Sequence, residues 1–125
     1  MNKSVSIKRA YDAPESADGF RVLVDRVWPR GRTRESLALD QQAPGLAPSA
    51  ALRKWFSHDP ELWTAFRERY EQELQTESMH ERMSELLAAA NGRHITLVYG
   101  AKDEAHNHAI VLRDALLRFL STAGR

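Results

Sequence analysis

The stretch that decides the fold is Phe20-Arg21-Val22-Leu23-Val24-Asp25-Arg26-Val27, followed directly by Trp28-Pro29-Arg30-Gly31. Its Val-Leu-Val centre offers apolar side chains to both faces of a sheet, as in strands that are covered on both sides. Pro29 cannot donate to a strand ladder and disfavours helix at Trp28, so the strand is predicted to end in a stiff turn. Gly31 permits a positive φ or the close approach of a ligand.

Two other segments have strand patterns. Residues 5–9 alternate apolar and polar or basic side chains, which predicts a short strand with one buried face. Residues 94–99 form a second strong apolar strand. The segments 12–19 and 41–47 contain Pro and Gly and are predicted to be loops.

Caps and apolar spacing predict the helices. Thr33 is the expected cap of a short helix over 34–38, and Pro48-Ser49 opens another that breaks at Ser57-His58-Asp59-Pro60. Further helices are expected from Asp59-Pro60 to Leu74, from Glu77 to Ala90 and from Glu104 to Leu120. This order predicts a small Rossmann-like three-layer α/β domain, with a short, mainly parallel sheet flanked by helices. We expect the 125 residues to form a single domain, since they show no repeat or linker.

Composition excludes several classes of protein. The chain has no cysteine, so it can form neither a disulfide nor a thiolate nucleophile or metal ligand. No run approaches the ~18 apolar residues of a membrane span, and the first residues lack the apolar stretch of a signal peptide. We therefore expect a cytoplasmic protein without a membrane partner, and the sequence leaves its oligomeric state open.

Positive charge is concentrated near the start of the chain. Residues 1–34 hold eight Lys and Arg against four acids, whereas the remainder holds ten against thirteen. A local positive cluster on a nearly neutral protein suits a small anionic ligand better than nucleic acid, which usually binds to strongly basic domains. The alternative is a solvated arginine-rich surface.

The carboxyl edge of the sheet is the expected binding site, because ligands of open parallel sheets bind there. By this rule three segments are expected to meet at the edge: Arg9 to Tyr11, Asp25 to Arg30 and Tyr99 to His108. The last also brings a helix N-terminus, which favours an anion. We expect a phosphate or carboxylate pocket whose ligand-binding candidates are Arg9, Arg26, Trp28, Arg30, Arg53, Tyr99, Lys102 and Asn107.

Each of these assignments has a structural alternative. Arg30 before Gly31 is the strongest ligand candidate, because a guanidinium on a rigid turn matches phosphate or carboxylate bidentately. Trp28 either stacks on a planar ligand or packs as a wedge, and Arg53 is either an anion ligand or solvated.

Three residues are candidates for proton transfer, namely Asp25, His58 and Asp103. Asp25 is either a base beside Arg26 or its salt-bridge partner, and His58 is either an acid or base or a residue of a helix connection. The sequence His106-Asn107-His108 suggests a metal site, but side chains that are two positions apart in a helix point in different directions and cannot share one ion. We therefore expect no metal site and no cofactor.

Long ordered blocks carry a resemblance to a known family. They are Arg21 to Gly31, Ala47-Pro48-Ser49, Leu52 to Pro60, and Val98 to Asp103 with Asn107, Ala109 and Leu112. From about residue 7 to 115 the chain resembles the YeaO-like branch of domain of unknown function four-eight-eight. The resemblance implies a small Rossmann-like fold and no particular activity. Longer relatives carry a Cys-His-Arg stretch where this chain has His106-Asn107-His108, so thiol chemistry does not transfer.

Two functions follow from these observations. The first is an enzyme on a small phosphorylated or carboxylated metabolite or nucleotide, with Arg26, Arg30 and Lys102 holding the anion. The second is a non-catalytic module that binds a small anion or contacts nucleic acid through the same arginines. A scaffold within a larger assembly is a third, weaker hypothesis. A concave pocket that gathers these residues favours a small ligand, whereas an open arginine-rich face favours nucleic acid.

Overall fold

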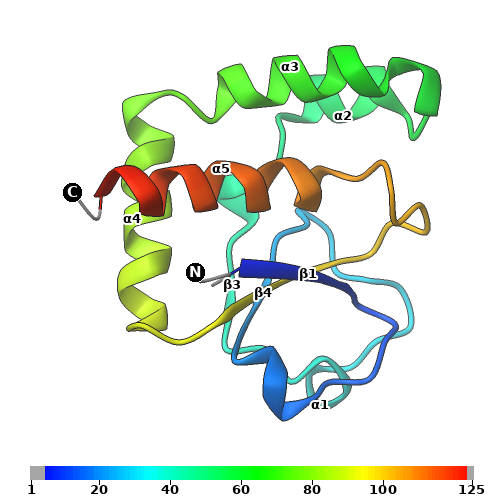
Figure 1. Ribbon diagram of the computed structural model, residues 1–125. Coiled ribbons are helices and arrows are strands. Elements are labelled where there is room, and N and C mark those ends of the chain that lie inside the picture. The colour runs from blue at the N-terminus through cyan, green and yellow to red at the C-terminus, as the bar shows by residue number, and fades with distance from the viewer. Residues whose placement is uncertain (1–4, 124–125) are drawn as a thin grey trace.

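The computed structural model describes residues 5–123, which form a parallel sheet packed against helices (Figure 1). Its strands are β1 (Val5–Arg9), β2 (Phe20–Leu23), β3 (Gln41–Gln42) and β4 (Ile95–Tyr99). Its α-helices are α1 (Arg34–Leu37), α2 (Ala50–Phe56), α3 (Trp63–Glu73), α4 (Glu77–Ala90) and α5 (His108–Ala123). Short 3₁₀ helices cover Ser16–Asp18, Pro44–Leu46 and Pro60–Leu62.

The strands lie in the order β1-β4-β2-β3, and every pairing is parallel. Arg9 is in register with Tyr99, and Leu23 is in register with Val98. The carboxyl ends of β1, β2 and β4 therefore meet at one edge of the sheet. The predicted α/β fold class is confirmed.

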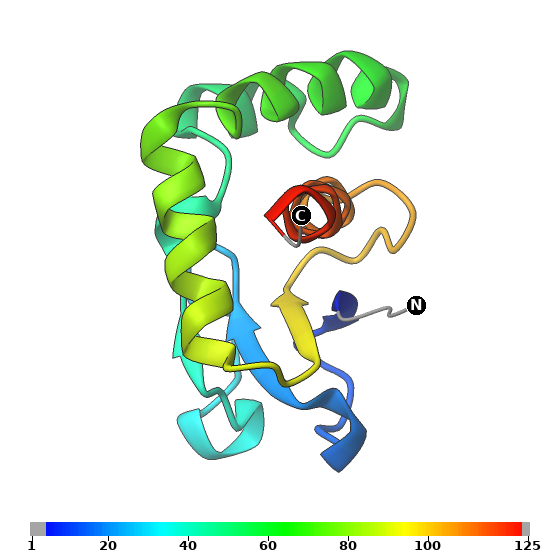
Figure 2. The ribbon, with the colours of Figure 1, turned by 60° about the vertical axis from the view of Figure 1, so that its left-hand side comes forward.

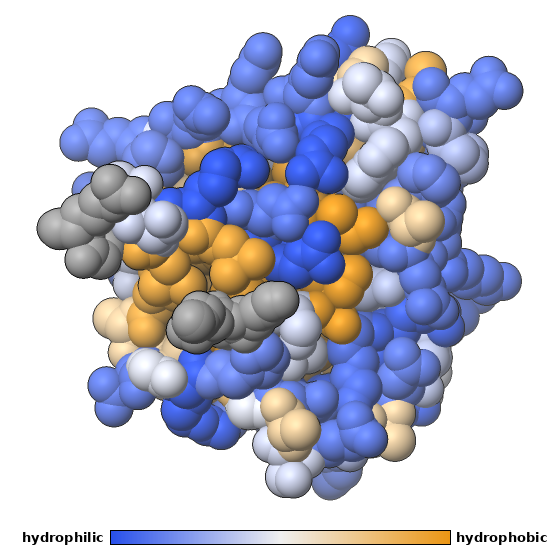
Figure 3. Space-filling model, in the orientation of Figure 1, coloured by the Kyte–Doolittle hydropathy of each residue, from blue (hydrophilic) through white to orange (hydrophobic). Residues whose placement is uncertain are grey.

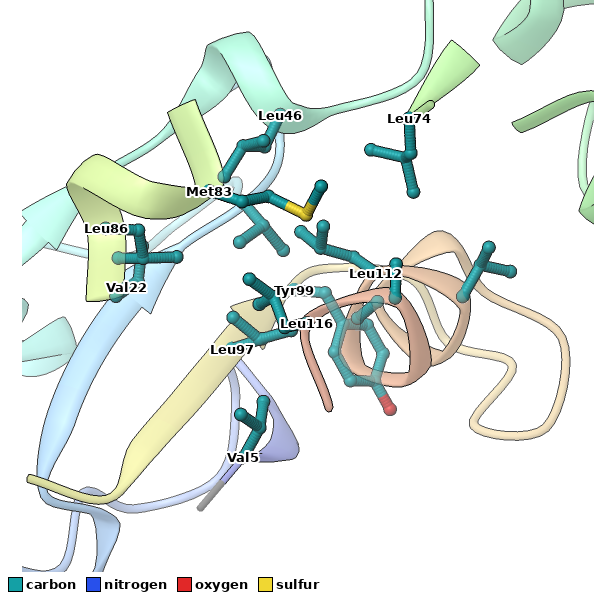
Figure 4. Close-up of a cluster of buried hydrophobic side chains, with 14 of the residues drawn as sticks. Val5, Val22, Leu46, Leu74, Met83, Leu86, Leu97, Tyr99, Leu112 and Leu116 are labelled. Carbon is teal, nitrogen blue, oxygen red and sulfur yellow. The ribbon is translucent and has the colours of Figure 1, made fainter. Parts of the chain in front are cut away.

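Most of the core lies between the sheet and the helices α2 to α5. Helix α5 packs against β1 and β4 and is itself covered by α3, which packs against α2 (Figure 2). Alternate residues of β2 and β4, such as Val22 and Leu97, point to this side and meet Met83, Leu86, Leu112 and Leu116 (Figure 4). Burial of these apolar side chains is the main stabilising contribution.

The opposite face of the sheet has a thinner cover. Ala10, Leu23 and Val98 pack there against Leu37 of α1 and the partly buried Leu39. The sheet thus lies between a thick helical layer and a thin one.

In the view of Figure 1, the surface is mostly hydrophilic around an apolar area near α5 and β1 (Figure 3).

Capping residues place most helices where the sequence predicts them. The hydroxyl of Thr33 accepts from Ser36 N–H, that of Ser49 from Leu52 N–H, and that of Thr76 from Met79 N–H. Each cap satisfies a backbone donor that the helix itself leaves free. Asn91 ends α4 in the left-handed conformation at φ 52°.

Three expected boundaries are wrong. The strand predicted over 20–27 ends at Leu23, although Val24 N–H still donates to Val98 O at 3.0 Å. The loop predicted over 41–47 contains β3 and a 3₁₀ helix, because the backbone there pairs with β2. The last helix runs from His108 to Ala123 rather than from Glu104 to Leu120.

Among residues 5–123, the helices are all too short or too polar to cross a bilayer.

Candidate functional site

A cavity of about 560 Å³ lies at the carboxyl edge of the sheet. Its walls come from the segments that follow β1, β2 and β4, from α2 and the residues that flank it, from α3 and from the start of α5. The lining residues are Tyr11, Asp25, Arg26, Val27, Trp28, Pro29, Arg30, Ala47, Pro48, Ala50, Arg53, Lys54, Phe56, His58, Phe66, Gly100, Ala101, Asn107 and His108. Cavities of this size hold small-molecule ligands in other proteins.

Three hydrogen bonds hold the loop after β2 in place. Arg26 Nε donates to Pro48 O at 3.0 Å, and Trp28 Nε1 donates to Arg32 O at 2.7 Å. The hydroxyl of Tyr11 donates to the carbonyl of Arg30 at 2.9 Å. These contacts fix the backbone of the loop and leave the Arg30 guanidinium at the cavity.

The cavity is rich in positive charge. Arg26, Arg30, Arg53 and Lys54 line it, and Asp25 is the only acid among the lining residues that the structure describes. Within residues 5–123, none of these four cations lies in an ion pair. The positive charge is therefore available to an anion.

Asp25 is held by backbone and imidazole contacts. Its Oδ2 accepts from Gly100 N–H at 2.9 Å, and its Oδ1 lies 3.2 Å from His108 Nε2. A Cβ on Gly100 would lie 3.0 Å from the Asp25 carboxylate, so glycine permits this close approach. A salt bridge between Asp25 and Arg26 is one of the two interpretations of the sequence. It does not form, because the two side chains have different partners.

Aromatic and apolar side chains form another part of the lining. The rings of Phe56 and Phe66 stack with centroids 4.2 Å apart and planes 19° apart. The His58 ring lies 6.2 Å from Phe56, on an exposed residue with φ 58°. Together with Ala47 and Pro48 these rings suit the carbon skeleton of a ligand, whereas the cations suit its charge.

The cavity brings together most of the residues that the sequence singled out. Seven candidates line it, namely Asp25, Arg26, Trp28, Arg30, Arg53, His58 and Asn107. Four do not, namely Arg9, Tyr99, Lys102 and Asp103.

Those four have other positions. Arg9 Nε donates to Ala101 O at 2.9 Å, while Lys102 is exposed. Tyr99 is buried in the core, and this burial raises the pKa of its phenol. The Asp103 carboxylate accepts from the N–H groups of Ala105 and His106, which lowers its pKa and stabilises the loop.

Helix α5 starts later than expected, so the helix N-terminus at the pocket is not formed by the residues that the sequence indicated. The segment Lys102-Asp103 is a loop and not a helix start, because the side chain of Asp103 folds the chain into a turn. Asn107 is the residue next to the helix, and its Oδ1 accepts from Ile110 N–H at 3.2 Å. The helix N-terminus therefore contributes His108 to the cavity.

His106 lies outside the helix, so helical geometry does not govern its relation to His108. Its Nδ1 lies 3.0 Å from Asp103 Oδ2, and its ring meets Trp63 edge-on at 5.5 Å. No group of three or more His, Asp or Glu that could hold a metal ion occurs among residues 5–123.

The sequence brings the segment Tyr99 to His108 to the same edge as Asp25, but it does not single out His108 as the residue beside Asp25. Lys54, like Arg53, is either an anion ligand or a solvated side chain by sequence, and it lines the cavity. The position of His108 at the carboxyl edge, nine residues after Tyr99, is the signal that could have connected it with Asp25.

Comparisons with known proteins give one consistent result. A family model described as "Inactive DUF488-N3 subclade" matches residues 4–124. The uncharacterized protein YeaO of Escherichia coli is 43% identical over 114 residues, covering 90% of this chain and 96% of its own length. The uncharacterized protein Rv3073c of Mycobacterium tuberculosis is 34% identical over 112 residues, covering 90% and 92%. No solved structure matches the chain significantly.

Proposed function

Because this chain belongs to the family described as the inactive DUF488-N3 subclade, we propose that it binds a small anionic molecule in its cavity without chemical turnover. The ligand is a phosphate or carboxylate compound. The observation that carries the proposal is a cavity of ligand size lined by four cations that have no ion-pair partner within residues 5–123. Guanidinium groups bind such anions through paired hydrogen bonds.

The arrangement of these cations supports a small ligand over nucleic acid. Arg26, Arg30 and Arg53 converge on one concave site from two separate segments. Nucleic-acid interfaces instead spread their basic residues over an extended face. The aromatic lining from Phe56 and Phe66 supports an organic anion with a carbon skeleton.

An enzyme on a small phosphorylated metabolite or nucleotide is the second candidate. The pair of Asp25 and His108 favours it, since such pairs move protons in many active sites. However, no Ser, Thr or Cys nucleophile occurs among the described residues that line the cavity. This lack, together with the description of the family as inactive, supports binding over turnover.

Titration calorimetry with inorganic phosphate, citrate and a panel of sugar phosphates and nucleotides tests the proposal. We expect at least one compound to bind and Arg30→Ala to weaken its binding about tenfold or more, because a hydrogen bond to a charged group is lost. Arg34→Ala is the matched control, since Arg34 is exposed on α1 and outside the cavity. Its affinity should equal that of the wild type.

Two results would contradict the proposal. If Arg30→Ala and Arg34→Ala bind every compound as the wild type does, the cavity is not the anion site. If ³¹P NMR of a bound phosphate ester detects a new product that Asp25→Asn abolishes, the enzyme hypothesis replaces the binding hypothesis.

A further inference from the structure

The ring of His108 is held in one orientation at the cavity. Its Nε2 lies 3.0 Å from the carbonyl oxygen of Val24 and 3.2 Å from Oδ1 of Asp25. Neither a carbonyl oxygen nor a carboxylate has a proton to give, so Nε2 must be the donor. In the neutral imidazole the proton is therefore on Nε2, and Nδ1 has a free lone pair.

The contact of Nε2 with Asp25 is close but is not a hydrogen bond. Oδ1 of Asp25 is buried and has no hydrogen-bond donor among residues 5–123, because the Nε2–H group of His108 points to Val24 O. The Val24 carbonyl thus fixes the tautomer, and the nearby carboxylate favours the same orientation of the Nε2–H dipole.

Two other side-chain acceptors of the lining already have a donor, whereas the exposed ring of His58 has no hydrogen bond among residues 5–123. Oδ2 of Asp25 accepts from Gly100 N–H, and Oδ1 of Asn107 accepts from Ile110 N–H. Nδ1 of His108, by contrast, has no hydrogen bond within the described part of the chain. The cations Arg26, Arg30, Arg53 and Lys54 are donors only.

The volume of the cavity indicates a ligand larger than its charged group. About 560 Å³ is within the range of sites that hold whole organic ligands, whereas phosphate has only five heavy atoms. Beyond the anion, the rest of such a ligand meets apolar side chains and the imidazole of His108.

We propose that Nδ1 of His108 accepts a hydrogen bond from a hydroxyl group of the ligand, so that the cavity selects hydroxylated organic phosphates, the class to which sugar phosphates belong. This inference rests on the proposed anion-binding function and adds the specificity of that site. The arginines bind the phosphate group, and His108 distinguishes a hydroxylated skeleton from an alkyl one. A site with an unpaired acceptor rejects a ligand that cannot donate to it.

Two probes of similar shape test the inference, namely glucose 6-phosphate and cyclohexylmethyl phosphate, which has a six-membered ring without hydroxyl groups. Calorimetry at pH 8.5 compares them, because an ordinary imidazole is neutral there. We expect His108→Phe to weaken glucose 6-phosphate binding about tenfold and to change cyclohexylmethyl phosphate binding less than about twofold. The control is His80→Phe, an exposed residue of α4 outside the cavity, which should leave both affinities unchanged.

The outcomes separate the two proposals. If both probes bind and His108→Phe changes their affinities equally, the specificity inference is overturned and the anion site stands. If neither probe nor inorganic phosphate binds to the wild type, the anion site itself is wrong and the inference falls with it.

A second measurement uses only the wild-type protein, so it does not depend on whether a variant folds. ¹⁵N NMR of the wild-type histidines at pH 8.5 should find His108 with its proton on Nε2 and with a non-protonated Nδ1. Glucose 6-phosphate should then shift the Nδ1 resonance, whereas cyclohexylmethyl phosphate should not. A proton on Nδ1 in the free protein, or an equal response to both probes, would overturn the inference.

Discussion

Two regions of this molecule differ in whether their positively charged side chains have carboxylate partners. Under the thin face of the sheet, Lys8, Asp18 and Arg21 form what we term the buried ion cluster, and the exposed Glu15 contacts Lys8 at its rim. Arg21 Nη1 lies 2.7 Å from Asp18, and Lys8 Nζ lies 3.1 Å from Asp18 and 2.8 Å from Glu15. At the carboxyl edge, Arg26, Arg30, Arg53 and Lys54, which we term the cavity cations, have no carboxylate partner within residues 5–123.

The paired cations stabilise the fold, whereas the unpaired cavity cations are available to bind a ligand. Arg21 is 3% exposed, and its Nε and Nη2 both donate to Leu37 O, so its charge is fully used within the protein. The cavity cations repel one another, and this repulsion costs stability that an anion would offset. Stability and ligand binding should therefore respond to substitution in separate regions.

The largest effect on stability is expected from Asp18→Ala. Removing this carboxylate leaves the buried Arg21 without its counter-charge, which costs about 3–5 kcal/mol when one partner of a buried pair is lost. Urea unfolding followed by circular dichroism measures the change. Asp12→Ala, on the same loop but exposed, should change the free energy of unfolding by less than about 0.5 kcal/mol. Equal losses in the two variants would contradict the importance of the buried ion cluster.

The second effect is a loss of stability in acid. Burial alone would raise the pKa of Asp18, but hydrogen bonds from Glu15 N–H, Lys8 and Arg21 outweigh it and hold the pKa below its ordinary value of 3.8. A lowered folded-state pKa contributes stability above the unfolded value, and this contribution is lost as pH falls through the folded one.

Urea unfolding from about pH 5 downward should therefore show a steeper loss of stability in the wild type than in Asp18→Asn. Arg30→Ala should keep the wild-type slope, because it lies outside the buried ion cluster. A wild-type slope in Asp18→Asn would show that other carboxylates, such as Asp114 beside Arg67, govern acid unfolding.

The smallest effect on stability is expected at the cavity. Arg53→Ala removes one of several like charges from an exposed position, so the free energy of unfolding should change by less than about 0.5 kcal/mol in either direction. Thermal unfolding at low ionic strength is the suitable measurement, because salt screens the repulsion among the cavity cations. A loss as large as that of Asp18→Ala would mean that Arg53 stabilises the fold instead of being available for a ligand.

The sequence predicts elements well where local signals agree. Helix α4 has a Thr76 cap, regular apolar spacing and an Asn91 stop, and its observed bounds match the predicted ones. The parallel arrangement of the strands brings Asp25 and Arg30 to the expected edge, because that rule depends only on strand direction.

The errors arise where contacts between distant residues decide the structure. Strand β3 has no apolar pattern, and its place follows from backbone pairing with β2. The Asp103 turn delays the last helix, and the contact of Asp25 with His108 joins residues far apart in the chain. No local pattern encodes such a contact.

The strand order has a consequence for how the protein acquires its structure. β4 lies between β1 and β2, and β1 is hydrogen-bonded only to β4 within the described sheet. During synthesis, β1 therefore cannot form its hydrogen bonds until residues 95–99 have been made. Before that, β2 can pair only with the two-residue β3. Pairing over such a distance is slow, because the loop must close before its contacts form. Synthesis of the fourth strand is thus the event that allows the sheet to form, and the cavity needs in addition the residues that follow this strand, up to His108.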